Sequence, residues 1–170
     1  DPREGYQVYN WLSSLFPGES AEQAKLRLAA CLLRDVHWSE HPDYRAEQAF
    51  LRVLRLPSVG LEHEDRAGLA LAIFYRYRTD DKIPTVDQAH AMVDDDCLHR
   101  VRTIGLGLRL AYVLAGGAPG ILEKSKLEVA GATLMLSVPS SEPVFDGGSY
   151  PKRLSRLAAH IGKKDKIKRI

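Results

Sequence analysis

The sequence is poor in cysteine, which excludes two classes of protein. Cys31 and Cys97 are its only cysteines among 170 residues. They form no zinc-binding pattern and cannot supply the framework of a disulfide-rich secreted domain. We therefore expect a reducing compartment, the cytoplasm, and expect both side chains to be buried free thiols.

Long apolar runs are also missing. No stretch approaches the roughly 18 residues of a membrane-spanning helix, so no membrane association is expected. The first five residues, Asp1–Gly5, lack the basic-then-apolar pattern of a signal peptide. They also lack an initiator Met, and we expect a processed product or a piece of a longer protein.

Several catalytic motifs are absent. The sequence has no glycine-rich loop between a strand and a helix, no nucleophile elbow and no pattern typical of a serine triad. We predict no catalytic residue in this chain.

The composition is that of an ordinary globular domain, but the charge is uneven. Hydrophobic residues make up 45% and charged residues 27% of the chain. Residues 151–170 carry eight Lys or Arg against one acid, whereas residues 1–150 carry 16 against 21. We predict one helical domain over 1–162 and a frayed basic tail over 163–170, suited to an anionic partner or simply solvated.

Helical periodicity dominates and predicts a mainly α fold, a bundle of about seven helices with one small β-hairpin. The predicted helices cover residues 3–16, 20–33, 44–55, 63–77, 86–93, 95–115 and 150–162. The helix 20–33 is apolar almost all round and is expected to be central. The hairpin pairs 126–130 with 133–138 through Gly131-Ala132.

Capping and turn signals place the helix ends. Ser20 and Gln23 predict a capping box, and Asp43 and Thr85 are candidate caps of the helices that follow them. Pro42 is expected to break the helical pattern. Turns are predicted at 56–60, 79–82 and 116–120.

The segment Ala29–Val36 carries the strongest chemical hint. It is similar to the His-Asp element of metal-dependent phosphohydrolases, but Arg34 stands where His would precede Asp35. Arginine has no lone pair for a metal, so no metal ion is predicted. His37 and His41, four residues apart, could restore a site only on a continuous helix. The alternative is that Asp35 caps the helix or pairs with an arginine.

Further segments extend the resemblance in order along the chain. Arg3-Glu4-Gly5, Pro42–Gln48, Tyr75–Arg78 and Leu108–Tyr112 are similar to stretches of the exopolyphosphatase / guanosine pentaphosphate phosphatase family. The chain resembles that family's C-terminal helical domain, a degenerate His-Asp-type domain. Tyr112 replaces a frequent Asp, so both departures remove candidate metal ligands.

The resemblance implies a parent protein of two halves. Its N-terminal half would be an actin-like catalytic domain that uses Mg²⁺, and this chain would hold no cofactor of its own. The expected partners are inorganic polyphosphate, that catalytic domain and a second copy of the chain in a homodimer. Whether the parent prefers polyphosphate or guanosine pentaphosphate stays open.

Basic side chains are the candidate polyphosphate ligands. Arg102 and Arg109 are seven residues apart on one predicted helix and would project from nearly the same face, about 10 Å apart. The alternative is that their stems cover the core. Further candidates are Arg76, Arg78, Lys152, Arg153 and Arg156.

Three other functions are alternatives to polyphosphate binding. A dimerisation or interdomain module would use exposed aromatics of the first helix, such as Tyr6, although most are expected in the core. A residual metal phosphohydrolase would need metal at Asp35. Nucleic-acid binding through the tail is not expected, because the body is acidic and lacks interleaved aromatics.

Overall fold

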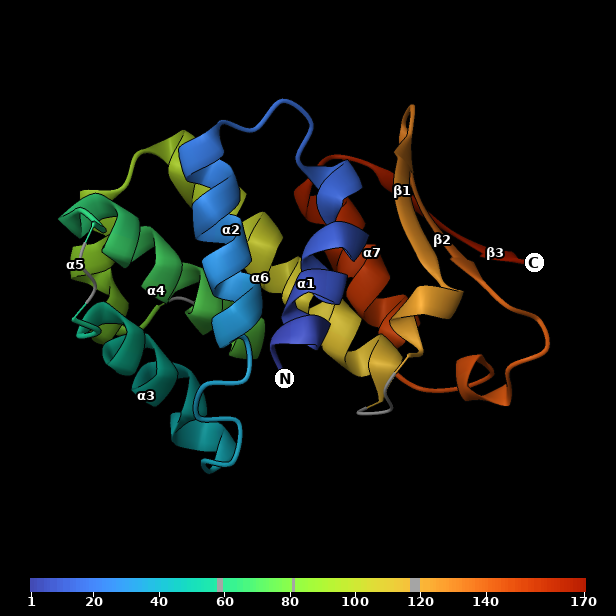
Figure 1. The fold of residues 1–170 in the computed structure, drawn as a ribbon, viewed down its shortest axis with the longest axis horizontal. Coiled ribbons are helices and arrows are strands. Elements are labelled where there is room, and N and C mark those ends of the chain that lie inside the picture. Colours follow the sequence, from blue (N-terminus) through green and yellow to red (C-terminus); the bar gives the residue numbers. More distant parts are fainter. Residues whose placement is uncertain (58–59, 81, 117–119) are drawn as a thin grey trace. The chain divides into compact units, whose positions relative to one another are not determined.

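A computed structural model describes residues 1–57, 60–80, 82–116 and 120–170. Over these residues the fold is mainly α, with seven α-helices and one small sheet (Figure 1). The helices are α1 (Pro2–Trp11), α2 (Ala21–Leu33), α3 (Pro42–Leu54), α4 (His63–Tyr77), α5 (Pro84–Met92), α6 (Asp95–Ala115) and α7 (Tyr150–His160). The strands are β1 (Lys126–Ala130), β2 (Thr133–Val138) and β3 (Lys164–Arg169).

The chain divides into two compact units. One unit contains residues 20–105, and the other contains residues 1–19 and 106–170. Helix α6 runs from the first of these into the second. The prediction of one domain over residues 1–162 stays a prediction.

In the unit of residues 20–105, α4 is the central helix. Every residue from Ala67 to Arg76 is buried, and α4 packs against α2, α3 and α5. The expectation that the helix 20–33 is central is wrong, because α2 exposes Leu32 (41%). A helix that is apolar on all sides is buried in the core, and the GLALAIF segment of α4 is more apolar on all sides than α2 is.

The same unit contains a close helix–helix approach at Gly105. A Cβ placed there would lie 2.4 Å from the Cβ of Tyr75 and 2.8 Å from the carbonyl oxygen of Ala72. Real Cβ atoms do not come so near other heavy atoms. Glycine is therefore required where α6 crosses α4.

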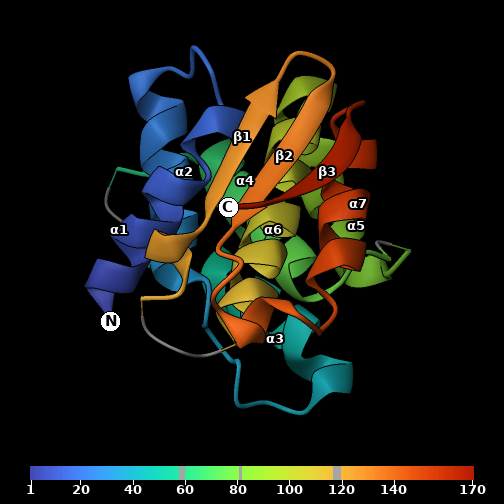
Figure 2. The same cartoon turned by 90° about the vertical axis from the view of Figure 1, so that its right-hand side faces the viewer.

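In the unit of residues 1–19 and 106–170, the sheet has the order β1-β2-β3. The hairpin of β1 and β2 was predicted correctly, and it is antiparallel from Lys126↔Ser137 to Ala130↔Thr133. β3 then adds to β2 in parallel, from Thr133↔Lys164 to Val138↔Arg169. Figure 2 shows the three strands side by side in front of α7.

The frayed tail expected over 163–170 is wrong, because residues 164–169 form β3. The α7 helix ends at His160, Gly162 follows with a positive φ of 69°, and the chain turns back along β2. Ile167 points to the α7 side of the sheet with Leu136, its partner in the register. Backbone pairing and one apolar anchor hold a strand whose other residues are exposed.

Helix starts were predicted in part. The capping box is present, with Ser20 accepting from the Gln23 amide and Gln23 accepting from the Ser20 amide. Asp43 is not a cap, because Pro42 starts α3 rather than breaking a helix and His41 precedes it as the cap. Thr85 is not a cap either, since α5 begins at Pro84.

The first predicted helix, 3–16, is two elements, α1 and a 3₁₀ turn over Ser13–Leu15. The turns predicted at 56–60, 79–82 and 116–120 each include residues outside the described part of the chain. Within the described residues, no helix is long and apolar enough to span a membrane.

Candidate functional site

Asp35 lies between two arginines just after α2. Its carboxylate is 3.3 Å from the Arg34 guanidinium and 3.6 Å from that of Arg76 on α4. Arg34 also donates to the Cys31 carbonyl at 3.0 Å. The expectation that Asp35 pairs with an arginine is confirmed, and the His-Asp position holds a charge-balancing contact.

Tyr77 fixes the backbone beside this contact. Its hydroxyl donates to the carbonyls of Val36 at 2.9 Å and Arg34 at 3.2 Å. The guanidinium of Arg76 lies 4.6 Å from the centre of the Tyr77 ring, and that of Arg45 lies 5.6 Å away. Cations over an aromatic face are attracted to it, so Tyr77 stabilises both the turn and its arginines.

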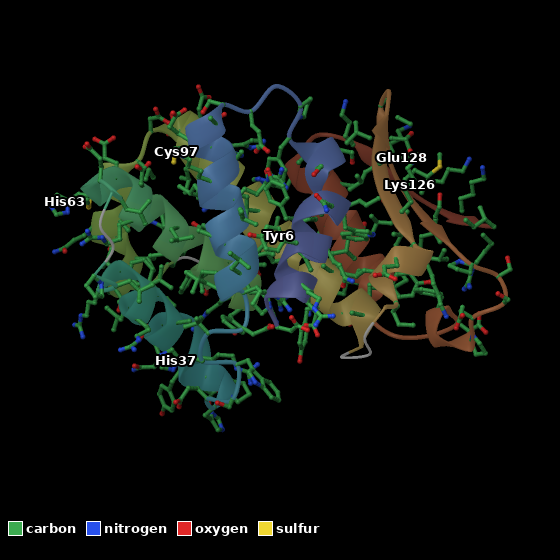
Figure 3. The ribbon with its side chains drawn as sticks, in the orientation of Figure 1. Tyr6, His37, His63, Cys97, Lys126 and Glu128 are labelled. Carbon is green, nitrogen blue, oxygen red and sulfur yellow. The ribbon has the colours of Figure 1, made fainter. Side chains whose placement is uncertain are left out.

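The two histidines considered as replacement metal ligands contact different acids. His37 lies 3.6 Å from Glu40, and His41 lies 3.6 Å from Asp43. His37 has a positive φ of 59°, so no helix continues through it (Figure 3). Among the described residues, no three His, Cys, Asp or Glu side chains are gathered as a metal site would need.

Two other candidate arginines in this unit have local partners. Arg78 follows α4 in an extended conformation, and its guanidinium is 3.8 Å from Asp80. Arg102 on α6 is half-buried, and its guanidinium lies 5.1 Å from the centre of the Tyr75 ring. Arg102 therefore lies against the core, which is the alternative that the sequence gives for it.

Tyr75 also contacts a histidine. Its hydroxyl is 2.8 Å from Nε2 of His90 on α5, and the two rings are stacked. Burial raises the pKa of Tyr75, partly opposed by Arg102. Burial lowers the pKa of His90, partly opposed by Asp87. The raised pKa of Tyr75 and the lowered pKa of His90 both agree with a neutral His90 whose Nε2 accepts a hydrogen bond from the Tyr75 hydroxyl.

The remaining candidates lie in the unit with the sheet. Arg109 is half-buried on α6. On α7, Lys152 and Arg156 are exposed, opposite the buried Leu154, Leu157 and Ala158. Burial and the nearby charge of Arg156 lower the pKa of Arg153, so the two cations lie close together. The prediction that residues 102 and 109 form one site stays a prediction, since they belong to different units.

The outer face of the sheet gathers lysines from β1 and β3. Side chains alternate along a strand, so residues level with one another in the register share a face. The buried Leu127, Leu134 and Leu136 mark the inner face. The outer face therefore carries Lys126, Glu128, Ala130, Thr133, Met135, Ser137, Lys164, Lys166 and Lys168, of which Ser137 is buried.

An open groove lies at the other edge of the sheet, where β1 meets α1. It measures about 480 Å³ and is lined by Trp11, Leu127, Glu123, Glu128 and Lys126, among others. Acids outnumber bases in its lining, so it does not suit an anion. Trp11 closes one side by donating to the Ser125 hydroxyl at 3.1 Å.

The KDKIK segment contained a signal that was missed. Its single apolar residue, Ile167, stands between lysines at alternate positions, which is the period of a strand. High charge and the position near the end of the chain favoured a frayed tail instead.

Comparison with protein-family models matches residues 10–167 to the exopolyphosphatase C-terminal domain. The chain belongs to this family. No curated protein matches the chain. In this exopolyphosphatase C-terminal domain, Arg34 precedes Asp35 and forms an ion pair with it.

Proposed function

We propose that this domain binds inorganic polyphosphate and presents it to a catalytic domain elsewhere in the parent protein. The parent would be a cytoplasmic, homodimeric exopolyphosphatase whose actin-like N-terminal half uses Mg²⁺ and an activated water. The family membership supports the reaction class, and the basic surface of this chain supports the ligand.

One observation carries the proposal. The unit that contains the sheet carries 12 Lys or Arg against eight acids, whereas the other unit carries 12 against 14. Within the first of these, Lys152 and Arg156 are exposed on α7 and β3 carries three exposed lysines. Several cations along a polymer add their contributions, because once one phosphate is held the next binds at a high effective concentration. Such binding lets a chain advance without leaving the domain.

Polyphosphate is favoured over guanosine pentaphosphate as the ligand of this domain. The groove between α1 and β1 is lined by two glutamates and one lysine, so it would repel the phosphates of a nucleotide placed there. A polymer needs only cations along a path.

Calorimetric titration with long-chain polyphosphate at two salt concentrations tests the proposal. We expect binding that weakens steeply with salt, because each lysine or arginine contact releases counterions. The variant K152Q/R156Q should bind more weakly than the native chain. The variant R102Q/R109Q tests the arginine pair, and K25Q/R52Q/K82Q removes three exposed cations elsewhere as the charge-matched control. No binding by the native chain at low salt would rule the proposal out.

A dimerisation or interdomain module is the second candidate, and exposed aromatics favour it. Tyr6 on α1 is 52% exposed (Figure 3). Tyr112 on α6 is 43% exposed, and both tyrosines belong to the unit that contains the sheet. The other two aromatics of α1, Tyr9 and Trp11, are half-buried. Sedimentation at increasing concentration, repeated with Y6S/Y112S, would detect a dimer that depends on these side chains. A dimer without polyphosphate binding would favour this candidate.

A further inference from the structure

The strand β3 places three lysines in one row. In the parallel register, Lys164, Lys166 and Lys168 are level with Thr133, Met135 and Ser137 of β2. These β2 residues are out of phase with the buried Leu134 and Leu136, so the three lysines share the sheet's outer face, away from α7. Asp165 and Ile167 point to the other side.

The row is exposed and positively charged. All three lysines are exposed, and within the described part of the chain none of them forms an ion pair. Lys126 on β1 adds a fourth lysine to the face, and its ammonium is 2.8 Å from Glu128, the face's only acid (Figure 3). Four lysines and one glutamate leave the face with a net charge of +3.

The spacing of the row suits a linear polyanion. Lysines two residues apart on a strand are about 6.6 Å apart, so the row is about 13 Å long. One phosphate or pyrophosphate can contact only part of it, whereas an extended chain can contact all three ammonium groups. Arginine binds phosphate through two N–H groups in a fixed geometry, whereas lysine carries a point charge on a flexible side chain. A row of lysines can therefore bind a polyphosphate chain while the chain shifts along it.

We propose that this row, Lys164, Lys166 and Lys168, is the track on which an extended inorganic polyphosphate chain lies. The inference rests on the proposed function and assigns it a place in the fold. It names a strand face rather than the arginine pair of α6 or the cations of α7.

The composition of the face argues against single-stranded nucleic acid. Proteins that bind such strands combine cations with aromatic side chains on which the bases stack. The face has no aromatic residue, and its neutral members are Ala130, Thr133, Met135 and Ser137. Phosphate groups without bases are the ligand that this surface matches.

The test is calorimetric titration of the full chain and K164Q/K166Q/K168Q with long-chain polyphosphate, pyrophosphate and oligo(dT). Glutamine keeps most of each side chain, and circular dichroism and thermal unfolding verify that the sheet is retained. For long-chain polyphosphate at 0.1 M salt we expect about a hundredfold weaker binding by the variant. The slope of log Kd against log salt should fall by about two, since each contact contributes about 0.7.

A second variant gains binding and so cannot be explained by misfolding. Glu128→Gln removes the acid of the face and leaves Lys126 without that partner. We expect about twofold tighter binding of long-chain polyphosphate, the Coulomb effect of one unit charge about 10 Å away in water. The control K25Q/R52Q/K82Q removes as many charges as the row variant and should bind like the native chain.

The outcomes separate the inference from the proposed function. If the native chain binds long-chain polyphosphate and both K164Q/K166Q/K168Q and Glu128→Gln bind it equally well, the track is overturned and the function stands. If the row variant and the control weaken binding equally, the effect is net charge alone and the track is overturned. Equal affinity for pyrophosphate or oligo(dT) overturns the assignment to an extended polyphosphate, and no binding by the native chain overturns both proposals.

Discussion

The Asp35 carboxylate lies 3.6 Å from the guanidinium of Arg76, which is only 4% exposed. Arg34, at 9%, contacts the same carboxylate from the other side. In a His-Asp phosphohydrolase this aspartate would be a metal ligand; here it neutralises arginines at the end of a core helix. The contact therefore links the end of α2 to α4.

Asp35→Asn should destabilise the domain by about 1–2 kcal/mol. Arg76 would lose one of its partners while its charge stays buried, which is costly, but the Asp35 side chain is 43% exposed and water screens part of the effect. Urea unfolding measures the change. The matched control is Asp80→Asn, which removes the exposed pair with Arg78 and should stay within about 0.5 kcal/mol. Equal effects of the two substitutions would contradict a structural role for Asp35.

Gly105→Ala should destabilise by about 1–3 kcal/mol, the usual cost of overpacking. The new methyl would meet the Ala72 carbonyl oxygen and the Tyr75 backbone, neither of which can rotate away. Gly68→Ala on α4 is the control, since the nearest atoms to its added Cβ are 3.6 Å away. Alanine favours a helix, so this substitution should be neutral or stabilising by up to about 1 kcal/mol. Thermal unfolding of both variants measures the difference, and equal melting temperatures would contradict the close approach at Gly105.

His90 should make stability depend on pH below neutrality. Its pKa is lowered in the folded chain by burial, so as the pH falls below about 6.5 the unfolded chain takes up a proton that the folded chain resists. The stabilisation is complete above that pH and is lost as the solution becomes more acidic. One proton changes the stability by at most about 1.4 kcal/mol per pH unit.

Urea midpoints of the native chain and His90→Gln at pH 7.5, 6.5 and 5.5 measure this effect. We expect the native chain to lose more stability than the variant on acidification. The comparison removes the contributions of the other histidines, which both proteins share. Parallel curves for the two proteins would show that burial of His90 does not affect its titration.

Removing residues 163–170 should destabilise the unit that contains the sheet. The deletion takes away β3, which pairs with β2 along its length, and the backbone bond from Ile170 to Val138. We expect a loss larger than the ±0.5 kcal/mol or so typical of surface changes, with faster hydrogen exchange of the β2 amides. A frayed tail would leave both unchanged. Truncation is therefore a poor control for polyphosphate binding, and substitution of the lysines is the better one.

Local patterns were sufficient for most of the fold. The capping box at Ser20 depends on residues three apart, and the hairpin around Gly131 depends on neighbours in the chain, so both could be predicted. The starts of α3 and α5 were predicted two residues late, because Pro42 was expected to break a helix and Thr85 to cap one, whereas proline is favoured as a first helical residue. β3 was missed because its partner strand lies a whole helix away in the sequence.

The candidate site was predicted less well, because charges find partners through the fold. Arg76 was a phosphate candidate until α4 placed it beside Asp35, and Arg102 until α6 placed it against Tyr75. The lysines of β3 were expected in a solvated tail, but the structure places them in an ordered row on a strand. Sequence reveals how many charges there are but not which ones the folded chain leaves exposed.

The sequence by itself determined the mainly α class, the hairpin and the family, because each depends on residue identity and local spacing. Only the tertiary structure decided that α4 is central to its unit, that Gly105 is a contact point, and that Lys164, Lys166 and Lys168 share one face of a sheet. These features depend on which distant segments pack together. That choice is made by the burial of apolar surface and backbone pairing across the whole chain, which no local pattern contains.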